Sequence, residues 1–161
     1  MGATGRQRAG NAHAGKRETE SPPQPRVSRL YSLAAVLSLV GLADAIYLTV
    51  EHLTGRSVRC TVTSGCSEVL SSPYATIGGY PLALFGALGY FTAFSLATLA
   101  AFGSTRAGNL FAALVALMFA TSLWLLYLQA FVLHAFCQYC LLSAAITTLL
   151  AVIVVARRVK G

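Results

Sequence analysis

Apolar residues are concentrated in four long runs, which cover residues 30–50, 81–102, 109–133 and 136–156. Each run has at least the roughly 20 residues that an α-helix needs to cross a hydrocarbon core of about 30 Å. The pattern predicts an all-α membrane protein, a four-transmembrane-helix bundle. The first connection, residues 51–80, is the only long one.

Composition agrees with this fold class. Of the 161 residues, 56% are hydrophobic and 11% are charged, whereas a soluble domain is about half apolar and one quarter charged. A soluble or disordered chain is therefore excluded, and the length allows one domain. We expect a disordered basic tail over residues 1–28, a membrane domain over residues 29–157 and a short end over residues 158–161.

The net charge of +7 comes mainly from the ends of the apolar runs. Cytoplasmic connections are enriched in Lys and Arg, and the basic residues at these positions are Arg26, Arg29, Arg106, Arg157, Arg158 and Lys160. We therefore expect a multi-pass protein of the cell membrane with both termini in the cytoplasm. No broad basic face with interleaved aromatic residues is present, so nucleic acid is not an expected partner.

A cleavable signal peptide is the alternative for the first run. Arg26 and Arg29 precede an apolar stretch that contains Ala43-Asp44-Ala45, an A-x-A cleavage pattern. The run nevertheless continues as far as Val50, and the basic region is long for a signal. We interpret the first run as a retained span.

The four cysteines are Cys60, Cys66, Cys137 and Cys140. The predicted topology brings them all to the outer face, where disulfides form and persist. The third connection is very short, so the third and fourth spans should be antiparallel neighbours. Cys137 should lie near the amino end of the last span, where the helix dipole favours a thiolate.

Two redox-active pairs are the leading interpretation of these cysteines. A C-x-x-C bridge closes a very short loop and stabilises a fold little, so it suits redox exchange better than a structural role. An all-cysteine zinc site is an alternative, although the spacing differs from paired zinc knuckles. Two structural disulfides in a noncatalytic tetraspan protein are another.

Two electrons from a dithiol need an acceptor. The sequence contains no G-x-G-x-x-G and no C-x-x-C-H motif, so neither a dinucleotide nor a haem is indicated. A lipid-soluble quinone remains, and we expect no metal.

Several motifs together resemble the vitamin K epoxide reductase family in its bacterial form, over about residues 30–156. They are Cys60-x5-Cys66, Ser71-Ser72-Pro73-Tyr74-Ala75, Gly79-Tyr80-Pro81-Leu82-Ala83-Leu84-Phe85-Gly86 and Cys137-x2-Cys140. Their order and spacing, taken together, make the resemblance specific.

The resemblance implies an electron relay through the four cysteines. Cys60 would exchange with a DsbA-like thioredoxin-fold protein outside the cytosol, and Cys66 would pass electrons to Cys137. Cys140 would react with a quinone of the ubiquinone or menaquinone class, and the pathway would support disulfide formation. Ser72 matches the serine that supports the quinone head group in the family, although a turn or capping hydroxyl is the alternative.

Further candidates for the quinone site come from the apolar spans. Met118, Ser122, Leu125 and Gln129 recur at helical spacing, a pattern that plain packing also produces. Phe85 belongs to one of the matched motifs and could lie against the ring. Asp44 is costly within a span and is a functional candidate for that reason, with a loop-anchoring or proton-handling role.

The chain departs from animal members of the family. It has Ser143-Ala144-Ala145 where they carry a Thr-Tyr pair, and Pro81-Leu82 replaces a polar contact. Vitamin K epoxide reduction is therefore not expected. The chain ends five residues after Ala156, so we expect the thioredoxin-fold partner to be a separate protein.

Overall fold

The computed structural model describes residues 25–56, 58 and 60–160; the predicted tail up to residue 24 lies outside them. Within the described residues, four helices are long and apolar enough to cross a membrane: Ser28–Leu53, Leu82–Ala101, Thr105–Val132 and Gln138–Val159. Their mean hydropathy is between 1.7 and 2.4. The predicted fold class, an all-α protein with four spans, is confirmed.

The helices at the two ends of the chain extend into the predicted tail and the predicted end. Helix α1 (Pro25–Leu53) begins inside the predicted tail, because proline is favoured in the first turn, where its missing N–H costs nothing. Helix α5 (Gln138–Lys160) includes most of the predicted end. Arg157 near this end lies 5.5 Å from the ring centroid of Tyr31, and basic residues complement the partial negative charge of a helix carboxyl end.

Helix α3 (Leu82–Ala101) agrees with its predicted run to within a residue at each end. Helix α4 (Thr105–Tyr127) begins four residues before its predicted start, because Ser104 caps it and its side chain accepts a hydrogen bond from the Ala107 amide at 3.3 Å. The helix continues as a π-helical segment, η2 (Leu128–Val132).

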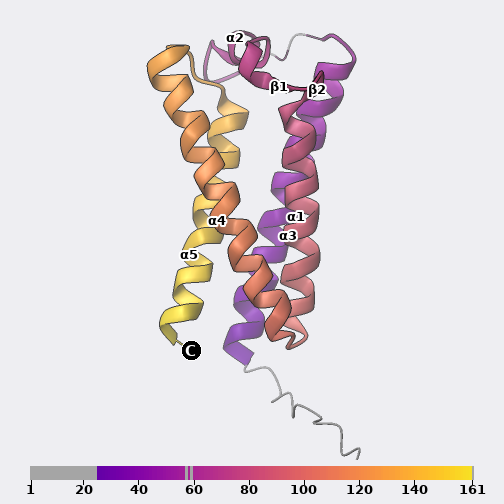
Figure 1. Ribbon diagram of the computed structural model, residues 1–161, viewed down its shortest axis with the longest axis vertical. Coiled ribbons are helices and arrows are strands. Elements are labelled where there is room, and N and C mark those ends of the chain that lie inside the picture. The colour runs from indigo at the N-terminus through magenta and orange to yellow at the C-terminus, as the bar shows by residue number, and fades with distance from the viewer. Residues whose placement is uncertain (1–24, 57, 59, 161) are drawn as a thin grey trace, which may run out of the picture.

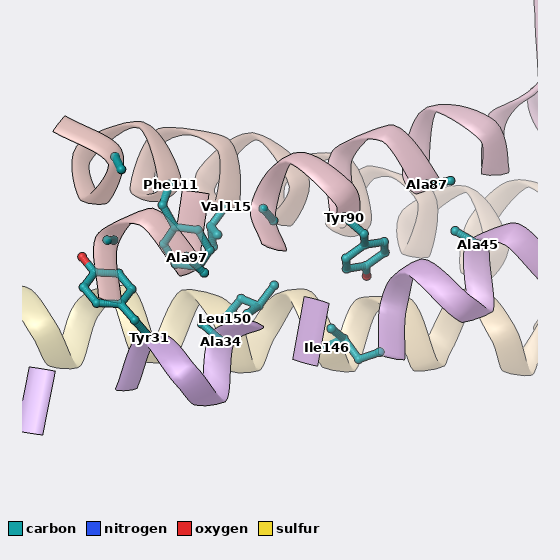
Figure 2. Packing of buried hydrophobic residues seen from close by; sticks show 13 residues of the cluster. Tyr31, Ala34, Ala45, Ala87, Tyr90, Ala97, Phe111, Val115, Ile146 and Leu150 are labelled. Atoms are coloured by element: carbon teal, nitrogen blue, oxygen red, sulfur yellow. The ribbon is translucent and has the colours of Figure 1, made fainter. Parts of the chain in front are cut away.

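The four long helices form a ring in which α1 and α4 each pack against both α3 and α5 (Figure 1). The antiparallel packing predicted for the third and fourth spans is confirmed. Small residues dominate the buried face of α3, which allows close approach of the backbones; they are Ala87, Ala93, Ala97 and Ala100. Figure 2 shows Tyr90 of the same helix pointing into the bundle.

The long first connection covers one end of the bundle (Figure 1). It contains α2 (Cys66–Leu70), a 3-10 turn η1 (Pro73–Ala75) and an antiparallel hairpin of β1 (Thr76–Ile77) and β2 (Tyr80–Pro81). Gly78 and Gly79 both have positive φ, 59° and 86°, as a two-residue type I′ turn requires. The start of α1 and the end of α5 lie at the opposite end of the bundle.

Candidate redox site

The four cysteines form one bonded and one unbonded pair. Cys60 and Cys66 are joined in a disulfide with their Cα atoms 5.6 Å apart, while Cys137 and Cys140 are free. Cys66 and Cys137 are buried, with 1% and 0% of their surface exposed, and Cys60 and Cys140 are half-buried. Cys66 and Cys137, the second and third cysteines in the predicted relay, are thus shielded from solvent.

The loop disulfide lies against the segment that precedes Cys137. A Cβ atom added to Gly65 would lie 2.8 Å from the Phe136 amide nitrogen and 2.9 Å from the Ala135 Cβ. Cys66 and Cys137 also belong to one buried apolar cluster, which includes Ala135. The absence of a side chain at position 65 therefore allows the loop to approach the C-x-x-C segment closely.

Gln138, inside the C-x-x-C motif, holds the other side of the loop. Its Oε1 accepts hydrogen bonds from the Thr61 amide at 3.0 Å, the Thr61 hydroxyl at 3.2 Å and the Val62 amide at 2.9 Å. These residues follow Cys60 directly. One side chain of the C-x-x-C helix thus fixes the loop that carries the disulfide.

Cys137 occupies the capping position of α5. Its carbonyl accepts the first helical hydrogen bond, from the Leu141 amide at 3.0 Å, and its own amide donates to Gln129 Oε1 at 2.9 Å. Hydrogen bonds from the Cys140 side chain, and from the backbone of Cys140 and Tyr139, lower the pKa of the Cys137 thiol to about 7. Burial and the charge of Asp44 act in the opposite direction. The geometry favours a thiolate at this position.

The thiolate of Cys137 is therefore expected to form with a midpoint near pH 7. Because the thiolate is the species that attacks disulfides, the reactivity of Cys137 should rise as pH increases through 7 and level off above it. Ultraviolet thiolate absorbance of the purified protein, with the loop disulfide intact, measures this titration.

Two variants control that titration. Cys137→Ala should lack the transition, and Cys140→Ala should shift it towards the ordinary thiol value of 9.0, because the largest lowering contribution is lost. A wild-type midpoint near 9 would contradict the assignment.

A largely apolar cavity of about 370 Å³ opens beside the C-x-x-C motif. This volume is within the range of pockets for small molecules, about 300–1,000 Å³. All four long helices line the cavity, and Val69, Leu70, Tyr74 and Ala75 of the first connection also contribute to its wall. Cys140 lies on its wall, and Cys137 does not.

All the predicted quinone contacts lie on the wall of this cavity: Ser72, Phe85, Met118, Ser122, Leu125 and Gln129. The bundle therefore brings together residues that are up to 57 positions apart in the sequence. Asp44, predicted as a supporting residue, lines the same cavity. Their contacts with a ligand stay predictions.

Ser72 acts as a turn hydroxyl in this structure. It is 9% exposed, and its Oγ donates a hydrogen bond of 2.7 Å to the Val69 carbonyl. The proton of the hydroxyl is thus already used. Ser72 can accept a hydrogen bond from a ligand as it stands, but it must rotate to donate one.

The polar candidates on α4 and η2 are also engaged within the protein. Gln129 is 2% exposed and uses its Oε1 on the Cys137 amide, so its Nε2 is the group left to donate to a ligand. Ser122 accepts a hydrogen bond of 3.0 Å from Thr147 of α5. The helical spacing indicated the right face of α4, whereas the π-helical turn at Gln129 was not expected.

Asp44 has no contact that would anchor a loop. It is 9% exposed, and its Oδ2 is buried without a hydrogen-bond partner among the residues that the structure describes. Of the two roles predicted for it, loop anchoring is not observed.

Sequence reasoning missed two polar residues at this site, Gln138 and Tyr90. Gln138 was not singled out, because nothing local in the sequence indicates that it reaches residues 61 and 62. The Tyr90 hydroxyl lies 2.7 Å from Ser143 Oγ and donates to the Ser143 carbonyl at 3.1 Å. A tyrosine in an apolar span was the available signal, since a buried tyrosine hydroxyl needs a partner.

The alternative with four zinc ligands is not consistent with this arrangement, because Cys60 and Cys66 are bonded to each other. Within the described residues, no group of three or more His, Cys, Asp or Glu side chains could hold a metal ion.

Comparison with known proteins identifies similar chains. Residues 32–155 match the family model for the vitamin K epoxide reductase family. The thiol-disulfide oxidoreductase LTO1 of Arabidopsis thaliana is 31% identical over 112 residues, which covers 64% of this chain and 30% of LTO1. The chain thus spans less than a third of the length of that relative.

Proposed function

The chain belongs to the vitamin K epoxide reductase family, and from this premise we propose that it is a membrane thiol oxidoreductase that transfers electrons from a thioredoxin-fold protein to a quinone. The observation that carries the proposal is the position of the two cysteine pairs. The loop disulfide lies on the C-x-x-C segment, and Cys140 faces an apolar cavity. Such a pathway would support disulfide formation in exported proteins.

Cys60 is the proposed entry point for electrons. It is the more exposed sulfur of the loop pair, and Val62 beside it is 85% exposed, which leaves an accessible apolar surface for a partner. The thiolate of the partner attacks Cys60 and releases Cys66 as a thiolate. A second partner thiolate then resolves the mixed disulfide, so the partner loses two electrons and the loop pair becomes a dithiol.

Cys66 and Cys137 are the proposed connection between the two pairs. When Cys137 and Cys140 are joined in a disulfide, the Cys66 thiolate attacks Cys137 and releases Cys140; Cys60 then attacks Cys66 and releases Cys137. The loop disulfide forms again and the C-x-x-C pair is reduced. This proposed product state has one disulfide in the loop and two free thiols in the motif, and the bonded Cys60–Cys66 pair and the free Cys137 and Cys140 support it.

Cys140 is the proposed site of quinone reduction. The cavity volume of about 370 Å³ and its apolar wall suit a quinone ring, and Asp44 on the same wall provides a carboxyl group for a polar ligand. Ser72, Gln129 and Phe85 would hold the ring. A bound quinone supplies a two-electron, two-proton acceptor, so oxidation of the Cys137–Cys140 dithiol is balanced.

The proposed orientation in the membrane follows from charge. Arg29, Arg106 and Arg158 lie within two residues of the start of the first, the start of the third and the end of the fourth membrane helix. The start of α1 and the end of α5 lie at the end of the bundle opposite the first connection (Figure 1). Basic flanks favour the cytoplasmic side. The cysteines would then face the extracytoplasmic compartment, as disulfide chemistry requires, and the thioredoxin-fold partner would act there.

Purified protein tests the proposal directly. With reduced DsbA as the dithiol and soluble ubiquinone and menaquinone analogues as acceptors, the quinone absorbance should fall by one equivalent per dithiol oxidised. A noncatalytic tetraspan protein with structural disulfides would leave both quinones unchanged, and that result would overturn the proposal.

A further inference from the structure

Asp44 is a buried carboxyl group without a partner, and it lies within the apolar membrane span of α1. Its Oδ2 makes no hydrogen bond within the described residues, and the residue is 9% exposed. An ionisable group in a transmembrane segment is costly and usually pairs with another group. Because Asp44 lies on the cavity wall without such a pair, its environment indicates a role towards a ligand.

Packing of α1 on α3 fixes the position of Asp44. One turn before it, a Cβ atom added to Gly41 would overlap the Tyr90 ring. Gly86 of α3 faces Ala45, the residue after Asp44. A Cβ atom added to Gly86 would lie 3.8 Å from the Ala45 Cβ, an ordinary van der Waals distance. Figure 2 shows Ala45 and Tyr90 along this interface. Asp44 thus lies on a closely packed helix pair.

Other polar groups of the cavity are already engaged. The Ser72 hydroxyl donates to the Val69 carbonyl, and the Tyr90 hydroxyl donates to the Ser143 carbonyl. Thr147 donates to Ser122. Asp44 differs from these groups because its unpaired oxygen can take up or release a proton without breaking a hydrogen bond of the fold.

The titratable groups that face the cavity come from several elements. Besides Asp44 they are His52 of α1, Tyr74 of η1, Tyr90 of α3, and Tyr139 and Cys140 of α5. Within the cavity wall as described, Asp44 is the only carboxyl group. It is also electrostatically coupled to the C-x-x-C pair, since its charge raises the pKa of Cys137 against the larger effect of the hydrogen bond from Cys140.

We propose that Asp44 carries a proton from the Cys140 thiol to an oxygen of the quinone. This inference rests on the proposed function. The Cys137–Cys140 dithiol loses two electrons and two protons when its disulfide forms. Asp44 takes one proton from Cys140 and delivers it to the acceptor. Cys137 reacts as a thiolate that has already released its proton to water, and the second proton of the quinol comes from water. The reaction is therefore balanced, and one of its two protons passes through the cavity by way of Asp44.

A single-turnover experiment tests the proton transfer. The purified protein is reduced at Cys137 and Cys140, mixed with a soluble ubiquinone analogue, and followed by quinone absorbance. Asp44→Asn should slow the reaction by about 10²–10⁴-fold, the usual contribution of a positioned acid or base. Asp44→Glu should recover part of the rate. Glu51→Gln, which removes an acidic group of α1 outside the cavity wall, should have the wild-type rate.

Two further measurements do not depend on quinone turnover. Exchange of the Cys60–Cys66 disulfide with dithiothreitol should be unchanged in Asp44→Asn, which shows that the variant is folded. In quinone-free wild-type protein, the infrared carboxyl band of Asp44 should change when the C-x-x-C disulfide is reduced, and Asp44→Asn should lack that change.

The possible failures are distinguishable. A wild-type protein that does not reduce the quinone would overturn the proposed function together with this inference. Wild-type turnover with an unimpaired Asp44→Asn variant would overturn the proton transfer alone. If Asp44→Asn does not fold, the infrared measurement on the wild type decides, and an Asp44 band that is insensitive to reduction contradicts the inference.

Discussion

Cys140→Ala is expected to abolish quinone reduction, with a loss of at least about 10³-fold, as for other removed nucleophiles. Of the two cysteines in the C-x-x-C motif, only Cys140 lines the cavity. Cys137 is fully buried and is not part of the cavity wall. Without Cys140 the motif can neither reach the acceptor nor form its disulfide. Quinone absorbance during oxidation of reduced DsbA measures the loss.

Entry of electrons should survive in the same variant. The Cys60–Cys66 disulfide of Cys140→Ala should still oxidise one equivalent of DsbA, because the loop pair is intact, and the reaction should then stop. Thr148→Ala, on the same helix but outside the cavity wall, is the matched control and should turn over normally. Sustained quinone reduction by Cys140→Ala would show that the assignment of Cys140 is wrong.

Cys66→Ala is expected to trap the partner on Cys60 and to abolish turnover. The proposed path from the loop to Cys137 runs through Cys66, which is 1% exposed and packs in the same cluster as Cys137. In this variant Cys60 is a free thiol, so oxidised DsbA is the probe. The Cys60 thiolate attacks the DsbA disulfide, forms the mixed disulfide and releases one DsbA thiolate, and the loop has no second cysteine to resolve the complex. Nonreducing electrophoresis should show the complex, and quinone reduction should fall by at least about 10³-fold.

Site mapping makes this result specific. The trapped complex should disappear with dithiothreitol and should not form when Cys60 is also replaced by alanine. Peptide mass spectrometry should locate the link at Cys60. A complex formed through Cys137 instead would reverse the proposed order of the relay, since it would place the buried cysteine at the point of entry.

Several features of the fold were accessible from the sequence because they depend on local composition. Apolar runs of about 20 residues predict spans in any bilayer, and the run at residues 81–102 agrees with α3 almost to the residue. The short third connection predicted the packing of α4 on α5. The exact start of α4 was harder to predict from the apolar pattern. The Ser104 side chain caps the helix, so α4 begins before the apolar run does.

Details of the redox site depended on contacts between distant residues. Gln138 reaches the amides of Thr61 and Val62, which precede it by 77 and 76 positions. Gln129 turns its amide oxygen to Cys137 from a π-helical segment. Such hydrogen bonds leave no periodic signal, so a pattern of hydrophobic and polar positions cannot predict them.

The sequence by itself determined the class of the protein, the four spans and the chemistry available to it, because transfer of apolar residues into a membrane and the reactivity of thiols are properties of the residues themselves. Only the tertiary structure decided that the loop pair is bonded while the C-x-x-C pair is free, that a cavity lies beside Cys140, and that Asp44 lacks a partner there. These features arise where α1, α3, α4 and α5 meet under the loop. They depend on packing between helices, which sets distances and burial that local sequence does not encode.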